Sequence, residues 1–108
     1  NLADLILDVR SEFGLPNLPI SIGNSGFGGF AQTAASRLAI INAQLAVSDP
    51  AKYPAFQDTV FTAETRSFWR GANVSPLDQG YHWNQNGETY WLLGKAMGEG
   101  MTGLLAPR

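Results

Sequence analysis

Apolar residues recur every three to four positions in three stretches of this chain, and that spacing predicts three amphipathic helices. The first covers residues 1–13, and Gly14 followed by Pro16 would end it. We expect this helix to pack one face against the rest of the domain and to expose its charged face. The expected buried face holds Leu2, Leu5, Ile6, Val9 and Phe13, and the expected outer face holds Asp4, Asp8, Arg10 and Glu12.

The second predicted helix covers residues 31–47, and the third covers residues 86–105. Their expected buried faces hold Ala34, Leu38, Ile41 and Leu45 in the second, and Tyr90, Leu93, Met97, Met101 and Leu104 in the third. Three glycines also fall inside the third helix, where each costs about 1 kcal/mol relative to alanine. They are Gly94, Gly98 and Gly100. Two interpretations stay open: the glycines let the helix lie close against a sheet, or the helix tolerates them.

Two short apolar runs, at residues 18–22 and 59–63, predict β-strands. The order of helix, strand, glycine-rich loop and helix is typical of an α/β protein with a parallel sheet. Two strands do not make a stable doubly wound sheet by themselves. We therefore expect either an unusual fold or further strands from another polypeptide segment.

His82 is the single histidine among the 108 residues, and it lies just before the third predicted helix. An imidazole held by a carboxylate can act as a general base near neutral pH. Asp78, four residues earlier, is the candidate carboxylate that would orient the imidazole. The alternative is an ordinary surface histidine near a helix start, and the residues alone favour neither interpretation.

Ser25 is a candidate nucleophile because it follows a predicted strand, as the serine of a nucleophile elbow does. The full elbow needs Gly-x-Ser-x-Gly and enters a helix directly, but Phe27 stands where the second glycine should be. We therefore favour a flexible loop here. Asp58 is a second candidate acid for His82, although a strand-end residue that bonds nearby backbone is the simpler prediction. Glu64 and Arg66 could form a surface pair.

Aromatic residues cluster in sequence around His82, and their flat apolar faces could stack on sugar rings. The three candidate substrate contacts are Trp69, Tyr81 and Trp83, and a role for Trp91 is also considered. At least half of the aromatic side chains in this region are expected in a core or an interface instead. With one histidine and no cysteine, the chain is expected to hold no metal and no cofactor. The glycine-rich loop at residues 23–29 does not match a phosphate-binding loop.

The chain carries few charges. Hydrophobic residues make up 44% and charged residues 15%, against about 25% charged in a typical domain. Either apolar surface meets another polypeptide, or the protein is secreted with an uncharged polar surface. An extracellular or periplasmic location is favoured. A net charge of −2 and the lack of a basic run argue against nucleic acid and anionic membranes as partners.

In order along the chain, four features resemble the C-terminal part of the sialate O-acetylesterase-like SGNH hydrolases, carbohydrate esterase family 6. They are the helix motif Asn1-Leu2…Leu5-Ile6…Val9-Arg10, the strand Leu18-Pro19-Ile20, the pair Asp78 and His82, and the helix motif Gly94-Lys95-Ala96-Met97. The resemblance implies that residues 1–108 form the C-terminal portion of one esterase domain. The implied fold is a three-layer, flavodoxin-like SGNH fold whose parallel sheet is completed by an N-terminal segment or a second chain.

The resemblance implies a serine esterase that removes acetyl groups from carbohydrate hydroxyls through an acyl-serine intermediate. His82 would be the base and Asp78 its orienting acid, although the family spacing is Asp-x-x-His and here it is Asp-x-x-x-His. The family's serine and oxyanion-hole residues belong to its N-terminal half, and their motifs do not occur in this sequence. The expected partner is therefore an N-terminal fragment of the same enzyme, and the expected substrate is an acetylated carbohydrate or another small ester.

Two other functions stay open. One is a non-catalytic carbohydrate-binding module that uses Trp69, Trp83 and Trp91. The other is a self-contained esterase that uses Ser25 as its nucleophile.

Overall fold

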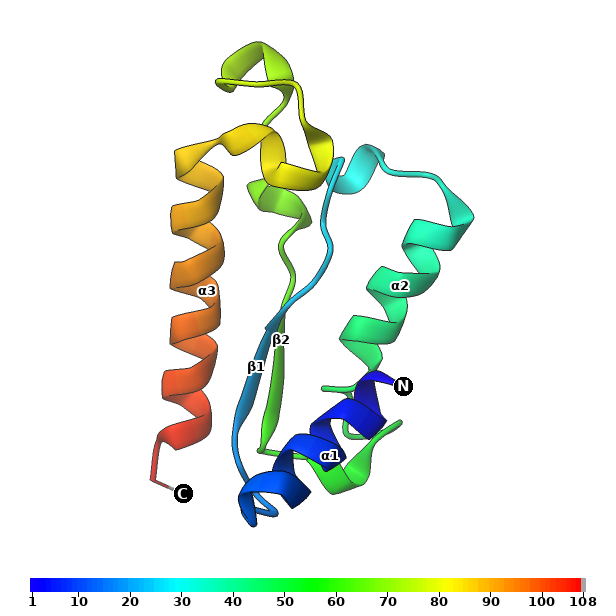
Figure 1. Cartoon of the computed structure of the whole chain (residues 1–108), viewed down its shortest axis with the longest axis vertical. Helices are drawn as coiled ribbons and strands as arrows, with labels where there is room; N and C mark the ends of the chain where they lie inside the picture. Colours follow the sequence, from blue (N-terminus) through cyan, green and yellow to red (C-terminus); the bar gives the residue numbers. More distant parts are fainter. Residues whose placement is uncertain (108) are drawn as a thin grey trace.

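A computed structural model describes residues 1–107 as a mixed α/β domain with two parallel strands between helices (Figure 1). All three predicted helices and both predicted strands form, with ends that shift by a few residues. The helices and strands are α1 (Leu2–Phe13), β1 (Ile20–Gly23), α2 (Ala35–Ala46), β2 (Val60–Ala63) and α3 (Gly87–Leu105). Short 3-10 turns lie between them at Gly29–Ala31, Pro54–Phe56, Arg66–Phe68, Ala72–Val74 and Gly80–Gln85.

Helix α1 ends where the sequence indicates. Gly14 has φ 64, and amides beyond the last turn donate to the carbonyls of Arg10 and Ser11. Helix α2 begins four residues later than predicted, at Ala35. Its predicted start falls in the turn that follows Gly28 and Gly29, both with positive φ, so the chain there is not helical.

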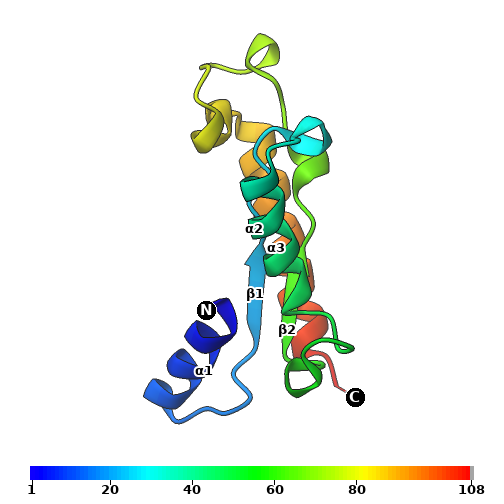
Figure 2. The same cartoon turned by 90° about the vertical axis from the view of Figure 1, so that its right-hand side faces the viewer.

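The sheet lies between two layers of helices. Figure 1 shows α1 and α2 on one side of the strands and α3 on the other, and the rotated view in Figure 2 agrees. The strands pair in parallel, with Ile20 opposite Val60 and Gly23 opposite Ala63. Alternate residues of each strand therefore face opposite helix layers.

A small apolar cluster lies between the sheet and the α1–α2 layer. It contains Ile6, Val47, Phe56 and Val60, with Ile20 and Ile22 packed against it. On the other face, the Ser21 hydroxyl donates to the Met97 carbonyl of α3 at 2.8 Å. The buried apolar core is small, and several large apolar side chains outside it are more than half exposed, among them Phe13, Phe30 and Leu105.

The predicted faces of α1 are partly wrong. Arg10, expected on the outer face, is only 4% exposed, whereas Leu5 and Phe13, expected to be buried, are 57% and 69% exposed. The Arg10 guanidinium donates to the carbonyls of Leu18 and Thr59, which lie just before the two strands. Burial lowers the pKa of Arg10. Arginine is therefore tolerated inside because backbone carbonyls satisfy its donors.

The glycines of α3 divide into two groups. A Cβ atom at Gly100 would collide with the Phe61 ring of β2, so close approach to the sheet requires glycine there. At Gly94 and Gly98, a Cβ atom would meet nothing within 4 Å. The close-packing interpretation is thus confirmed for Gly100 and is wrong for the other two within residues 1–107.

Candidate functional site

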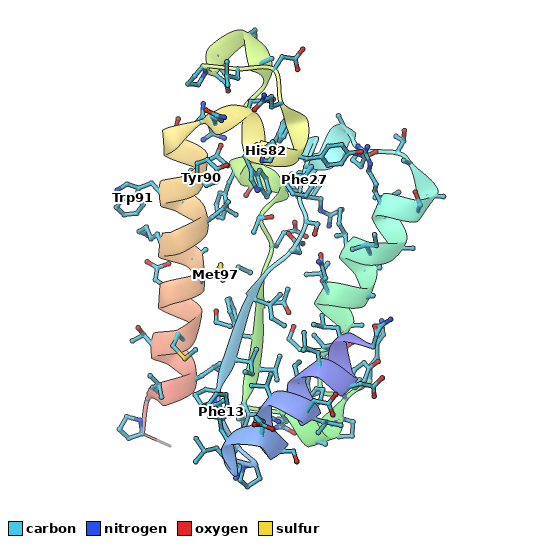
Figure 3. The ribbon with its side chains drawn as sticks, viewed as in Figure 1. Phe13, Phe27, His82, Tyr90, Trp91 and Met97 are labelled. Carbon is cyan, nitrogen blue, oxygen red and sulfur yellow. The ribbon has the colours of Figure 1, made fainter. Side chains whose placement is uncertain are left out.

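The carboxyl ends of the two strands meet at one end of the sheet, and the loops that follow them lie together there (Figure 1). His82 lies in this loop cluster, directly before α3 (Figure 3). Open α/β sheets bind ligands at the carboxyl ends of their strands. We therefore treat this end of the sheet as the candidate site.

Buried polar side chains tie the two strand ends together. Asn24, 2% exposed, follows β1, and Thr65, fully buried, follows β2. The Asn24 Oδ1 atom accepts from the Thr65 amide at 2.9 Å and from the Thr65 hydroxyl at 2.6 Å. The fixed spacing of these two loops positions the residues that come after them.

Glu64 completes this junction. It accepts from the Asn24 amide at 3.1 Å and from the Arg66 guanidinium at 2.9 and 2.6 Å. The hydrogen bonds from Arg66 lower the pKa of Glu64 to about 2, against the opposing effect of burial. The predicted Glu64–Arg66 pair is thus confirmed, and Arg66 also lies over the Phe30 ring at 4.6 Å.

The loop that carries His82 has an unusual backbone. Trp83, Asn84 and Gln85 have consecutive positive φ values of 52, 53 and 54. Such conformations are uncommon outside glycine, and asparagine adopts them more readily than most residues. Runs of this kind occur where surrounding contacts hold the chain in place.

Asn84 supplies those contacts. Its side chain is 1% exposed, accepts from the Gln79 amide at 2.9 Å and donates to the Arg70 carbonyl at 3.0 Å. Its own backbone amide donates to the Gln79 carbonyl at 3.0 Å. The sequence pattern did not identify this role of Asn84. Asn86 is the cap, and it accepts from the Thr89 amide at 3.0 Å.

The His82 imidazole is exposed, and the backbone of the residue is held on both sides. Its amide donates to the Gln79 carbonyl at 2.9 Å, and its carbonyl accepts from the Tyr90 hydroxyl of α3 at 2.7 Å. Asp78 is also exposed. Among residues 1–107, no hydrogen bond joins the Asp78 carboxylate to the His82 imidazole. The structure therefore brings the two residues into one loop without pairing their side chains.

The other two candidates lie in different surroundings. Ser25 follows β1, its hydroxyl accepts from the Gln44 amide at 2.9 Å, and its backbone amide donates to Gln44 at 2.7 Å. An amide cannot act as a general base, so this contact does not activate the serine. Asp58 precedes β2 and thus lies at the amino end of the sheet, whereas His82 lies at the carboxyl end.

Aromatic rings cluster beside His82. The ring of Phe27 lies 5.9 Å from that of Tyr81 and 4.7 Å from that of Trp83, and the ring of Trp69 lies 6.1 Å from that of Trp83. Trp83 is 8% exposed and forms the inner part of the cluster, whereas Tyr81 is 65% exposed. Trp91, on α3, is 64% exposed and lies outside the cluster (Figure 3).

A hollow of about 230 Å³ opens over this cluster. Trp69 and Tyr81 line it together with Arg37, whose guanidinium donates to the Tyr81 hydroxyl and lies over the Tyr81 ring at 4.8 Å. Aromatic walls with a few polar groups are typical of small-molecule sites. Within the described residues, no three histidine, aspartate or glutamate side chains come together as a metal site would require.

No protein-family model matches this chain, and no curated protein or solved structure matches it significantly. None of the helices in residues 1–107 has the length and apolar character needed to cross a membrane.

Proposed function

We propose that this chain is the C-terminal portion of an SGNH-type serine esterase that removes acetyl groups from carbohydrate hydroxyls. His82 is the general base, and Asp78 orients it. The serine nucleophile and the oxyanion hole lie on an N-terminal fragment of the same enzyme. The His82 imidazole takes the serine proton as the serine oxygen attacks the acetyl carbonyl, and it then gives that proton to the sugar oxygen as the bond between this oxygen and the acetyl carbon breaks. Water, deprotonated by His82, then hydrolyses the acyl-serine and releases acetate.

One observation carries this proposal: the single histidine of the chain is exposed at the carboxyl end of a parallel sheet, on a loop held by buried Asn84. A general base must be accessible to its substrate and fixed by its supports. The hydrogen bonds of the His82 backbone with the Gln79 carbonyl and the Tyr90 hydroxyl hold the residue in place, as the second requirement demands. The separation of Asp78 from His82 does not argue against the pair, because catalytic hydrogen bonds in unliganded sites often tighten only with substrate.

The layer order also supports the proposal. In a flavodoxin-like sheet, the last helix lies on the opposite face from the two helices before it, and α3 has that relation to α1 and α2. The hollow lined by Trp69 and Tyr81 supports a carbohydrate substrate, because these rings present apolar faces next to polar groups. Trp83 contributes by packing against the Trp69 and Phe27 rings.

The direct test is the activity of His82→Ala in the assembled enzyme. We expect kcat on an activated acetate ester to fall at least about a hundredfold, the scale of lost general-base catalysis. Lys52→Ala is the matched control, because Lys52 is exposed in the connection from α2 to the start of β2, whereas His82 lies at the carboxyl end of the sheet. Near-normal activity of His82→Ala would reject His82 as the base.

A serine-reactive fluorophosphonate probe, read by intact mass, locates the nucleophile. An adduct on a co-purifying second polypeptide supports the proposal. An adduct on Ser25 of this chain would instead support the self-contained esterase, which the contact with Gln44 does not favour.

The second candidate function is a carbohydrate-binding module, and the hollow over Trp69 is the observation that favours it. This function predicts that the isolated chain binds oligosaccharides, that Trp69→Ala weakens the binding, and that the activated acetate ester is not hydrolysed. Hydrolysis lost with His82→Ala would exclude it.

A further inference from the structure

We infer that a small hollow beside Tyr81 binds a short-chain carboxylate anion through Arg37 and Ser25. The hollow has a volume of about 140 Å³, and it is lined by Ser25, Phe27, Arg37, Ile40 and Tyr81. One water occupies about 30 Å³ in the liquid, so the hollow has room for an anion of the size of acetate or propionate. Acetate is the acid that the proposed hydrolysis releases, so the identity of the natural ligand rests on the proposed function.

This hollow is a neighbour of the larger one proposed for the sugar. Phe27, Arg37 and Tyr81 line both of them, so these three side chains form a shared wall. Tyr81 also directly precedes His82 in the chain. A ligand in the small hollow therefore lies against the loop that carries the candidate base, on the other side of the wall from the proposed sugar.

Arg37 brings a positive charge without an acidic partner. Within residues 1–107, no carboxylate forms an ion pair with its guanidinium, whereas Arg66 and Arg70 are each paired with a glutamate. The Arg37 guanidinium donates to the Tyr81 hydroxyl and lies over the Tyr81 ring at 4.8 Å. This contact holds the guanidinium at the hollow, and the remaining N–H groups can donate to the two oxygens of a carboxylate.

The place of Arg37 in α2 favours an anion further. Arg37 lies in the first turn of this helix, and that turn contains no acidic residue and no side-chain cap. The amino end of a helix carries a partial positive charge, whose effect is confined to about the first turn. The helix and the guanidinium thus act in the same direction on a ligand in the hollow.

Ser25 supplies a second, neutral donor. The Gln44 side chain donates to the Ser25 hydroxyl oxygen at 2.9 Å and accepts from the Ser25 backbone amide at 2.7 Å. A hydroxyl can accept one hydrogen bond and donate another. Among residues 1–107, the Ser25 hydroxyl donates to no acceptor, so its hydrogen is available to a ligand oxygen. The contact with Gln44 therefore suits Ser25 for binding, although it does not suit it for nucleophilic attack.

The rest of the wall is apolar and selects the kind of anion. Phe27 packs edge-on against Tyr81, with ring centroids 5.9 Å apart, and Ile40 follows Arg37 by three residues on the same face of α2. An alkyl group placed against these side chains is removed from water, which is favourable. Chloride and sulfate have no alkyl group and gain nothing there. The hollow thus fits a carboxylate with a short apolar tail.

The test is an NMR titration of the isotope-labelled chain with sodium acetate, compared with sodium chloride at equal ionic strength. We expect saturable shifts of the Ser25 and Tyr81 amide signals with millimolar affinity, as for other ligands of so few atoms. Propionate should bind about threefold more tightly than acetate, because it buries a further methylene group. Acetamide has the shape of acetate without its charge, and it should not displace acetate at equal concentration.

Four variants assign the binding to the hollow. Arg37→Gln should weaken acetate binding at least about tenfold, because it removes the charged donors. Lys52→Gln is the matched control, since it removes the same charge from an exposed residue outside the hollow, and it should leave the affinity unchanged. Ser25→Ala should weaken binding about threefold, the effect of one neutral hydrogen bond. Ile40→Ala should abolish the preference for propionate.

Arg37, Ile40 and Lys52 are exposed, so these substitutions should not unfold the chain. The inference is overturned if acetate gives no saturable shifts, or if chloride gives equal ones. It is also overturned if Arg37→Gln and Lys52→Gln bind acetate equally well, or if acetamide competes as well as acetate does.

The fluorophosphonate probe separates this inference from the proposed function. Saturable binding of acetate, without an adduct on any polypeptide, would keep the carboxylate site and reject the esterase. An adduct on a co-purifying polypeptide, without binding of acetate by this chain, would keep the esterase and reject the carboxylate site.

Discussion

The two ends of the sheet are held in different ways. At the amino end, one buried cation, Arg10, satisfies the carbonyls of Leu18 and Thr59. At the carboxyl end, buried Asn24, Thr65 and Asn84 hold the loops through amide and hydroxyl groups. The Glu64–Arg66 ion pair, bonded to Asn24, adds to them. At the amino end, the hydrogen bonds of Arg10 fix the chain just before the two strands. At the carboxyl end, the hydrogen bonds of Asn84 fix a loop that carries an exposed side chain, His82.

This contrast shows where function can reside. A loop with three consecutive positive φ values is costly unless its surroundings hold it. This loop lies at the carboxyl end, directly after His82. Among the described residues, the amino end has no run of consecutive positive φ values. Substitutions at the two ends should therefore have different consequences, which four predictions test in order of decreasing size.

The largest effect is expected at the amino end. Arg10→Ala leaves the Leu18 carbonyl without its donor and removes one of the two donors to the Thr59 carbonyl, so it should lower the free energy of unfolding by about 3 kcal/mol. Urea denaturation measures the loss. The NMR signals of His82 should stay unchanged in the folded fraction, and a shift of these signals would show that the two ends are not independent.

At the carboxyl end, Asn84→Ala should cost about 2 kcal/mol, because it leaves the Gln79 amide unpaired and removes the shorter of two hydrogen bonds to the Arg70 carbonyl. The His82 signals should now shift, and proteolysis within residues 77–85 should accelerate. Asn84→Asp is the matched control, since it keeps the acceptor for Gln79 and should cost less. Equal losses in both variants would contradict the role given to the Asn84 side chain.

Glu64 predicts a pH dependence. Its folded pKa of about 2 lies below its ordinary value of 4.5, so its stabilising effect is complete above about pH 4.5 and is lost as the pH falls toward 2. Because the pair is partly exposed, solvent screening reduces the effect to about 1 kcal/mol. Glu64→Gln should remove this part of the acid sensitivity in urea titrations between pH 5 and pH 2. An unchanged pH profile would contradict the assignment.

The smallest effect is expected at Tyr90. Tyr90→Phe removes the hydrogen bond to the His82 carbonyl and should cost about 0.5 kcal/mol, because the hydroxyl is exposed. The local motion of His82, measured by NMR relaxation, should increase more than the stability falls. A change in stability without a change at His82 would show that this bond supports α3 rather than the loop.

Periodicity predicted the elements well because each helix and strand has a regular apolar pattern. It failed for Arg10, whose position on the helix indicates an outer face, because no local pattern reveals that the Leu18 carbonyl, just before β1, takes its donor from this side chain. It also failed to separate Gly100 from Gly94 and Gly98, since only packing against Phe61 distinguishes them. For the site, the sequence indicated His82 and the aromatic cluster, but the buried role of Asn84 depends on contacts with Gln79 and Arg70.

The sequence by itself determined the order of helices and strands, the α/β class and the single candidate base, because these follow from local spacing and from composition. The tertiary structure alone decided which strand edge stays open, which side of α3 meets the sheet, and that Asp58 lies at the opposite end from His82. These features depend on contacts between residues far apart in the chain. Local propensity carries no information about such contacts, so only the folded arrangement reveals them.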